Sequence, residues 1–173
     1  MWMRLYKDKF VDSSQKRPIL HLLVGLPCSG KSTYAQGMQV EFPSVILNAD
    51  SWELALFGSI FPSERHEKVH DQLEKLLWGL GQDILRHGTS VVLDYGFWAR
   101  EERDYYRQTA GNMGLGFMIH YLDTPLEVIE ERVALRSAKE SEFNISYEDI
   151  LGWSRIFEPP LPGDQDTRII KSG

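Results

Sequence analysis

One eight-residue segment, 25–32, restricts the fold of this chain more than any other feature. It reads Gly-Leu-Pro-Cys-Ser-Gly-Lys-Ser and matches the pattern G-x-x-x-x-G-K-[ST] in full. The apolar run at 19–24 predicts a buried strand before it, and a helix is predicted after it at 31–41. The glycines of such a loop let its N–H groups turn inward and, with the helix N-terminus, bind phosphate oxygens. The sequence therefore predicts a phosphate-binding loop between a strand and a helix.

The residue types in this loop indicate ATP and Mg²⁺ as its ligands. Lys31 is expected to reach the β and γ phosphates, and the Ser32 hydroxyl to bind Mg²⁺. The other residues predicted to bind the nucleotide are Gly25, Cys28, Ser29, Gly30 and Thr33. Cys28 is interpreted as a small loop residue that faces away from the nucleotide. Alternatively, the helix N-terminus lowers the pKa of its thiol and makes it reactive.

The rest of the chain alternates between predicted strands and helices. Further strands are expected at 45–47, 90–93, 117–122 and 168–170. Helices are expected at 63–87 with Ser63 as N-cap, at 99–113, at 125–137, and from Ser146 to the prolines at 159–160. This alternation predicts an α/β fold with a parallel sheet covered by helices on both faces. We expect residues 1–17 to form an N-terminal extension and residues 18–173 to form one domain.

Composition narrows the classes of partner. The chain has one cysteine, which rules out an intrachain disulfide, and no apolar run long enough to span a membrane. We therefore expect a soluble, cytoplasmic protein. The expected assembly is a monomer or a homodimer, and the sequence does not decide between them. The formal net charge of −6 disfavours a long nucleic acid, which normally needs a basic face.

Two aspartates follow predicted strands at the edge where ligands bind in open α/β sheets. Asp94 ends the run Ser-Val-Val-Leu-Asp and is predicted to hold Mg²⁺; the alternative is that it caps the next turn. Asp50 ends Leu-Asn-Ala-Asp and is a candidate general base for an attacking hydroxyl. The residues alone equally allow Asp50 to be the N-cap of a helix that begins at Trp52.

Arginines are the candidate residues for neutralising the negative charge of the phosphates. Arg132 and Arg136 are four residues apart on one predicted helical face, where both can neutralise charge on a triphosphate. The alternative is a solvated face that pairs with neighbouring glutamates. Arg103, next to two glutamates, is more typical of surface ion pairs and is only a weak candidate.

Together these motifs resemble the small P-loop kinases of the nucleoside-monophosphate-kinase-like group. The nearest branches are polynucleotide 5′-kinases, chloramphenicol phosphotransferases and zeta-toxin kinases, which are also grouped with AAA-type ATP-binding proteins. The resemblance covers about residues 18–172. It implies the P-loop NTPase fold with a five-stranded sheet of order 2-3-1-4-5 and a small helical lid at about 132–148 that contains Arg132 and Arg136. It also implies that Asp50 is the general base and that residues 157–168 lie near adenine.

The predicted acceptor side carries one departure from this group. Polynucleotide kinases have a phosphate-binding arginine three residues after the catalytic aspartate, where this chain has Glu53. Aromatic residues and further carboxylates occur near this end; the aromatics are Trp52, Phe57, Phe61, Tyr95, Phe97 and Trp98. We expect a neutral or cationic acceptor with a stackable part, such as an antibiotic, amino sugar or nucleoside, although most of the aromatics could equally belong to the core.

Three functions are consistent with these features. The leading hypothesis is an ATP-dependent phosphotransferase that acts on a hydroxyl group of a small molecule. The second is a kinase for 5′-hydroxyl ends of nucleic acids. The third is an ATP-binding regulatory switch that transfers nothing.

Overall fold

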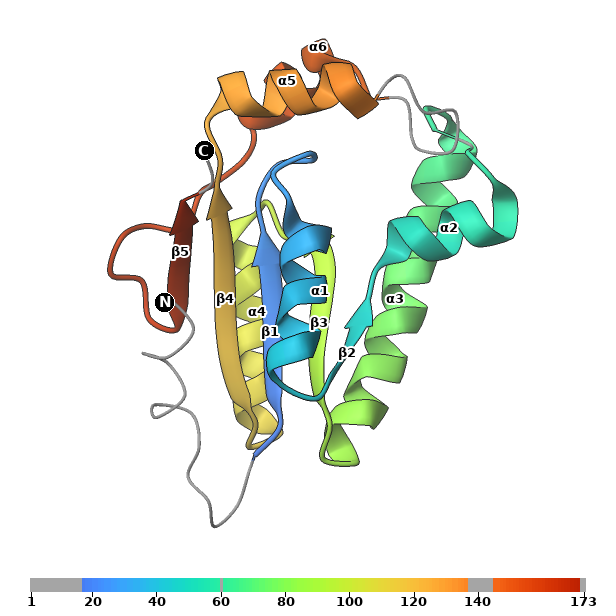
Figure 1. The fold of residues 1–173 in the computed structure, drawn as a ribbon. Helices are drawn as coiled ribbons and strands as arrows, with labels where there is room; N and C mark the ends of the chain where they lie inside the picture. Colours follow the sequence, from blue (N-terminus) through green and yellow to red (C-terminus); the bar gives the residue numbers. More distant parts are fainter. Residues whose placement is uncertain (1–16, 60, 137–144, 172–173) are drawn as a thin grey trace.

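The computed structural model describes residues 17–59, 61–136 and 145–171. These residues form five strands and six helices (Figure 1). The strands are β1 (Ile19–Val24), β2 (Ser44–Leu47), β3 (Ser90–Gly96), β4 (Gly116–Asp123) and β5 (Thr167–Lys171). The helices are α1 (Lys31–Glu41), α2 (Ala49–Phe57), α3 (Glu64–Arg86), α4 (Arg100–Asn112), α5 (Leu126–Arg136) and α6 (Tyr147–Ser154).

The strands form one parallel sheet in the order β2-β3-β1-β4-β5. This confirms the predicted fold class and strand order. The first strand lies at the centre of the sheet, hydrogen-bonded to β3 on one side and β4 on the other. The loop that follows β1 therefore emerges at the middle of the carboxyl edge, where the ends of β2 and β3 can reach it.

Helices cover both faces of the sheet, as expected. Helix α1 packs on one face through Ala35 and Met38, against Leu23 and Val92 of the strands. Helices α3 and α4 cover the other face (Figure 1), where the larger core cluster lies. Because both faces are covered, β1 is buried along almost its whole length, as its continuous apolar run predicts.

The long helix α3 is rotated relative to the pattern in the sequence. Its core face carries Leu73, Leu77 and Leu85, whereas Leu76 is 70% exposed and Leu80 is 43% exposed. In the sequence, both exposed leucines follow Leu73 and Leu77, each at a spacing of three, which is the pattern of one apolar stripe along a helix. That stripe is wider than the part of the helix that the sheet covers, so periodicity alone could not identify the buried edge.

The helix starts follow the capping signals. Ser63 accepts a hydrogen bond from the His66 N–H at the start of α3, and Ser146 forms a capping box with Asp149 at the start of α6. Helix α6 ends at Ser154, before the predicted proline stop. The sequence predicts a helix in the region of α2 only in the alternative in which Asp50 caps a helix that begins at Trp52. The structure has a helix here, but it begins at Ala49.

Helices α5 and α6 lie across the carboxyl edge of the sheet (Figure 1). They pack over the phosphate-binding loop, because Ile129, Val133 and Ile150 form a cluster with Leu26. The predicted lid at 132–148 falls partly on residues 137–144, and the predicted N-terminal extension falls almost wholly on residues 1–16; both segments lie outside the described residues. Among the described helices, none is both long and apolar enough to cross a membrane.

Two histidines are buried between the sheet and α1. His21 on β1 and His120 on β4 are 6% and 4% exposed, and their Nδ1 and Nε2 atoms lie 2.9 Å apart. The Tyr34 hydroxyl lies 3.0 Å from the other nitrogen of His120. Burial lowers the pKa of His21 to about 4. The pKa of His120 is also lowered, first by burial and then by the charges of His21 and Arg168.

Because of this buried histidine pair, we expect the folded protein to become less stable to unfolding in mild acid. Between pH 6.5 and about pH 4 the unfolded chain binds protons that the folded His21 does not, so the free energy of unfolding falls as the pH falls through this window. One such group contributes about 1.4 kcal/mol per pH unit, or about 3 kcal/mol over the window for His21. Urea unfolding at a series of pH values measures this slope.

A double variant, His21→Gln with His120→Gln, should show a shallower pH slope than the wild type. Substitution of the exposed His87 by Gln serves as the matched control and should leave the slope unchanged. Equal slopes in the wild type and the double variant would show that the buried pair does not cause the acid sensitivity.

Candidate functional site

The phosphate-binding loop, residues 25–32, is held tightly between β1 and α1. Gly25 has a φ of 149°, and its N–H donates to the Gly96 carbonyl of β3 at 3.2 Å. A Cβ atom at Gly25 would lie 2.9 Å from Ser29 Oγ and 3.1 Å from the Leu122 carbonyl oxygen. Only glycine fits this position, because both the backbone conformation and the space exclude a side chain.

The ammonium group of Lys31 lies against the loop itself. Its Nζ atom donates to the carbonyl oxygens of Gly25 and Leu26, each at 3.0 Å. Gly30 caps α1 with a φ of 100°. Cys28 is half-buried and has a φ of 61°. The lysine is thus positioned over the backbone groups that would surround a bound phosphate chain.

Ser32 and Asp94 meet at the end of the central strands. The Ser32 hydroxyl donates to Asp94 Oδ2 at 2.7 Å, and Asn48 Nδ2 donates to the same oxygen at 2.8 Å. Asp94 lies within β3 rather than after it, and it is 5% exposed. A hydroxyl and a carboxylate in contact fit the ligand preference of Mg²⁺, which binds hard oxygen atoms.

Asn48, rather than Asp50, caps the helix that begins here. Its side chain accepts a hydrogen bond from the Ser51 N–H at 2.7 Å, and α2 begins at Ala49. The alternative in which Asp50 caps a helix at Trp52 is therefore wrong. Asp50 lies in the first turn of α2 with its side chain 53% exposed, so its carboxylate is accessible from the carboxyl edge of the sheet.

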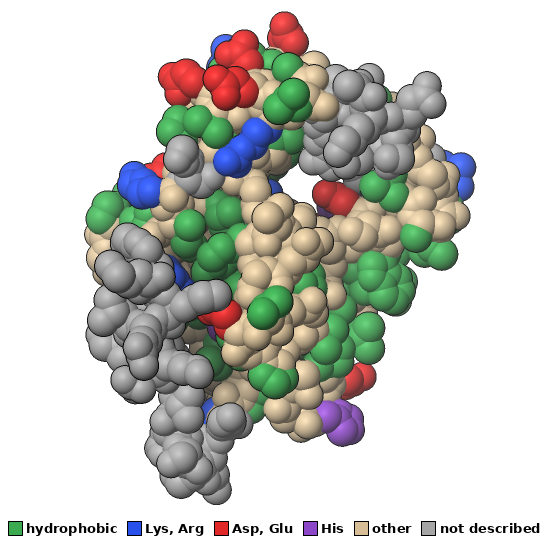
Figure 2. Space-filling model, in the orientation of Figure 1, with side chains coloured by type: hydrophobic (Ala, Val, Ile, Leu, Met, Phe, Trp, Pro, Cys, Tyr) green, Lys and Arg blue, Asp and Glu red, His purple; other side chains and the backbone are tan. Residues whose placement is uncertain are grey.

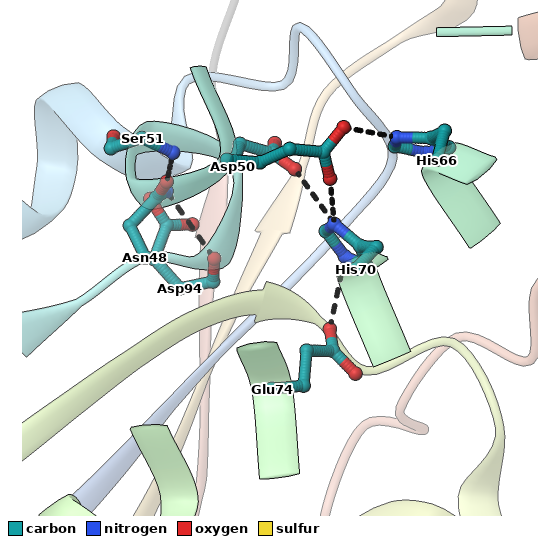
Figure 3. A network of polar contacts seen from close by, with 8 residues as sticks. Asn48, Asp50, Ser51, His66, His70, Glu74 and Asp94 are labelled. Atoms are coloured by element: carbon teal, nitrogen blue, oxygen red, sulfur yellow. Dashed lines mark hydrogen bonds and ion pairs between the residues drawn. The ribbon is translucent and has the colours of Figure 1, made fainter. Parts of the chain in front are cut away.

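Asp50 belongs to a polar network with α3 (Figure 3). His70 Nδ1 lies 3.5 Å from Asp50 Oδ1, and His70 Nε2 lies 3.3 Å from Glu74 Oε1. Desolvation by the surrounding protein raises the pKa of Asp50, whereas His70 and Lys31 lower it. Burial lowers the pKa of His70, but the hydrogen bond with Glu74 and the nearby carboxylates outweigh it and raise this pKa to about 9. A protonated His70 therefore lies beside Asp50 at neutral pH.

Glu53 does not face the open edge as its sequence position suggested. It is fully buried, and its Oε1 atom lies 2.6 Å from His66 Nδ1 on α3. The position that holds an arginine in polynucleotide kinases is thus occupied here by a buried glutamate that is hydrogen-bonded to a histidine of the neighbouring helix. Sequence reasoning missed both His66 and His70, although their spacing of four on a predicted helix places them on one face.

Arg132 reaches down from α5 onto the loop. Its Nη1 atom donates to the carbonyl oxygens of Cys28 and Ser29, at 3.2 and 2.9 Å. Arg136 is the last residue of α5, and its side chain lies outside the described residues. The arrangement places one predicted arginine at the phosphate-binding loop. Figure 2 shows that the molecule is hollowed beneath α5.

Arg103 has a structural environment that differs from the expected surface ion pair. It is 4% exposed, and its Nη1 atom donates to the carbonyl oxygens of Phe97 and Trp98 at 2.9 and 3.0 Å. The guanidinium therefore holds the turn between β3 and α4. This turn needs such support because Phe97 has a φ of 48°.

The aromatic residues divide between the core and the open edge. Phe97 is 2% exposed and belongs to the core. Half-buried Trp98 packs against Trp153 of α6, with ring centroids 5.5 Å apart, and Phe61 lies 6.3 Å from Trp153. Sequence analysis did not single out Trp153, because its neighbours come from distant parts of the chain.

Several solved protein structures resemble this chain over most of its length. It resembles a candidate kinase from Chloroflexus aurantiacus j-10-fl, with a TM-score of 0.72 and 21% identity over 90% of this chain and 85% of the other. It also resembles a gluconokinase from Sinorhizobium meliloti 1021, with a TM-score of 0.63 and 19% identity over 90% of this chain and 83% of the other. The likeness to a chain of the Pnkp1/Rnl/Hen1 RNA repair complex has a TM-score of 0.66 and 23% identity, and it covers 84% of this chain but only 45% of the other.

These likenesses show that the chain shares its fold with these proteins. No curated protein is significantly similar in sequence. One family model, described as an AAA domain, matches residues 20–160, which include the phosphate-binding loop, both aspartates and α5. The chain therefore belongs to this AAA domain family.

Proposed function

We propose that the protein is an ATP-dependent kinase that transfers the γ-phosphoryl group of ATP to a hydroxyl group of a small molecule. The observation that carries this proposal is the convergence of three groups at one sheet edge: the lysine-bearing loop, the Ser32–Asp94 pair, and the accessible carboxylate of Asp50. A binding switch needs the first two groups. A carboxylate that can accept a proton from the acceptor is needed only for transfer.

Each group has a role in the proposed reaction. Asp50 accepts the proton of the acceptor hydroxyl while the acceptor oxygen forms a bond to the γ-phosphorus and the bond to the β-phosphate oxygen breaks, which releases ADP. Lys31 and Arg132, joined by Arg136, neutralise charge on the phosphates. Backbone groups of Gly25, Cys28, Ser29 and Gly30 and the Thr33 side chain complete the nucleotide site.

Ser32 and Asp94 would hold Mg²⁺ with the nucleotide. When bound, the ion neutralises charge on the β and γ phosphates. The contact between the two side chains, with Asn48 as a further donor to Asp94, keeps their oxygens oriented toward the loop in the described structure.

The acceptor is proposed to be neutral or cationic with an apolar or stackable part. Half-buried Phe61, Trp98 and Trp153 supply aromatic surface near the open edge, and aromatic side chains bind such groups well. The carboxylates of Asp50 and Glu74, which both lie beside His70, make the surroundings acidic. Amino sugars, hydroxylated antibiotics and nucleosides have this chemistry.

A nucleic acid end kinase is the second candidate, because the chain is similar in structure to a chain of an RNA repair complex. The net charge of −6 and the buried Glu53 oppose it, since a nucleic acid phosphate would meet no arginine at that position. An ATP-binding switch without transfer is the third candidate.

The test is ATP consumption with Mg²⁺ in the presence of pooled acceptors, with mass spectrometry to detect an added phosphate. The pools contain amino sugars, hydroxylated antibiotics, nucleosides, and oligonucleotides with 5′-hydroxyl ends. A phosphorylated small molecule is the expected result. A phosphorylated oligonucleotide would instead support the second candidate, and ATP binding without any product would favour the switch.

A further inference from the structure

A second cluster of ligand atoms lies beside the proposed reaction site, between α2 and α3. Residues 66–70 read His-Glu-Lys-Val-His, which places two histidines four residues apart on one face of α3. Glu53 of α2 faces both of them. One ligand atom from each of Glu53, His66 and His70 lies within 4.8 Å of the other two.

The contacts within this cluster leave ligand capacity unused. Glu53 is 0% exposed, with Oε1 bound to His66 at 2.6 Å, whereas its Oε2 atom makes no hydrogen bond within the described part of the chain. His70 Nδ1 is likewise buried without a hydrogen bond there, and it lies 3.4 Å from Glu53 Oε2. A buried carboxylate oxygen that is not fully satisfied is costly unless a cation or donor binds it.

The surroundings orient these atoms as in a metal centre. His70 Nε2 faces Glu74 Oε1 at 3.3 Å, so this nitrogen keeps its proton when a metal ion displaces the proton on Nδ1. The Nδ1 lone pair is then directed at Glu53 Oε2, 3.4 Å away. A carboxylate behind a ligating histidine is the usual outer-shell arrangement. On the far side, Phe61 packs edge-on against His66 with ring centroids 5.0 Å apart.

We propose that Glu53, His66 and His70 bind one divalent transition metal ion of the zinc class. Two imidazole nitrogens and one carboxylate suit Zn²⁺, Co²⁺ or Ni²⁺ rather than Mg²⁺, which prefers oxygen ligands. Asp50 Oδ1 lies 3.5 Å from His70 Nδ1, close enough to accept a hydrogen bond from a metal-bound water while it remains outside the ligand set.

The pattern of this segment also occurs in zinc peptidases, but the arrangement differs. In those enzymes the glutamate after the first histidine acts as a general base at the metal. Here Glu67 is exposed, and the carboxylate that faces the histidines comes from another helix. We therefore assign a metal site that joins α2 to α3, with no hydrolytic role.

The ion would have a direct structural effect. The metal would strengthen the contacts between α2 and α3. Because α2 carries Asp50, the ion would also help to fix the position of the proposed base. Binding to the folded chain alone stabilises it by mass action, so the melting temperature should rise with Zn²⁺ concentration. This readout does not depend on any kinase activity.

The experiment measures metal binding to the full chain after treatment with a chelator, at about pH 8 so that protons compete less with the metal. Zn²⁺ is titrated against a chromophoric chelator in excess Mg²⁺, and Co²⁺ is added separately to record its visible absorption. We expect one Zn²⁺ per chain and a Co²⁺ spectrum of tetrahedral or five-coordinate type. Absence of stoichiometric Zn²⁺ binding by the wild type would overturn the proposal.

Variants assign the ligands. Glu53→Gln, His66→Gln and His70→Gln should each weaken Zn²⁺ binding by more than about 100-fold, and Glu74→Gln, which acts through His70, by about 10- to 100-fold. Glu67→Gln is the matched control in the same helix and should bind like the wild type, as should Asp94→Asn. If Asp94→Asn abolished Zn²⁺ binding while Glu53→Gln retained it, the ion would belong to the proposed Mg²⁺ site, and the proposal would be wrong.

Discussion

Replacing Asp50 by asparagine is expected to lower kcat for phosphoryl transfer by about 10²- to 10⁴-fold, because the variant loses the carboxylate that accepts the acceptor proton. The substitution keeps the size of the side chain and leaves the Asn48 cap of α2 in place. ATP affinity should therefore change little. The measurement is single-turnover transfer to the acceptor identified by the screen, together with calorimetric titration of ATP.

Asp83→Asn is the matched control, since Asp83 is exposed on α3 and pairs only with Arg86 among the charged residues in the described chain. It should leave both transfer and ATP binding unchanged. If Asp50→Asn transferred phosphate at the wild-type rate, Asp50 would not be the base. Loss of ATP affinity in this variant would indicate that Asp50 acts on the nucleotide rather than on the acceptor.

Replacing Lys31 by alanine is expected to lower kcat/KM for ATP by about 10²- to 10³-fold or more, because it removes a positive charge from the centre of the phosphate-binding loop. The ammonium now binds the Gly25 and Leu26 carbonyls, so it is held where the phosphates would lie. Unlike Asp50→Asn, this variant should lose ATP affinity as well as transfer. Steady-state kinetics and ATP titration distinguish the two patterns.

Lys75→Ala provides the control for this second prediction, because Lys75 is an exposed lysine of α3 that pairs with Asp71. It should retain wild-type kinetics. A Lys31→Ala variant with normal ATP affinity and normal transfer would contradict the assignment of residues 25–32 as the nucleotide site. Unfolding by urea should be compared for both variants, so that a loss of folding is not read as a loss of chemistry.

Local signals predicted most of the framework. The buried run of β1 and the glycine-rich loop after it identified a strand–loop–helix unit, and Ser63 and Ser146 marked the starts of α3 and α6. These signals are reliable because they depend on neighbours within a few residues. The start of helix α2 could not be predicted, because the sequence equally allowed a helix that begins at Trp52 with Asp50 as its cap. Only the hydrogen bond from the Ser51 N–H to the Asn48 side chain shows that Asn48 is the cap.

The sequence by itself determined the phosphate-binding loop, the fold class and the residue types near the sheet edge, because each is encoded in a short pattern or in regular spacing. The burial of Glu53 against His66, the neighbouring position of His70 beside Asp50, and the clamp of Arg103 on the β3–α4 turn were decided only by the tertiary structure. Each depends on how closely α2 approaches α3, or on how a turn closes over a core residue. Such distances arise from packing between segments far apart in the chain, and local sequence patterns contain no information about them.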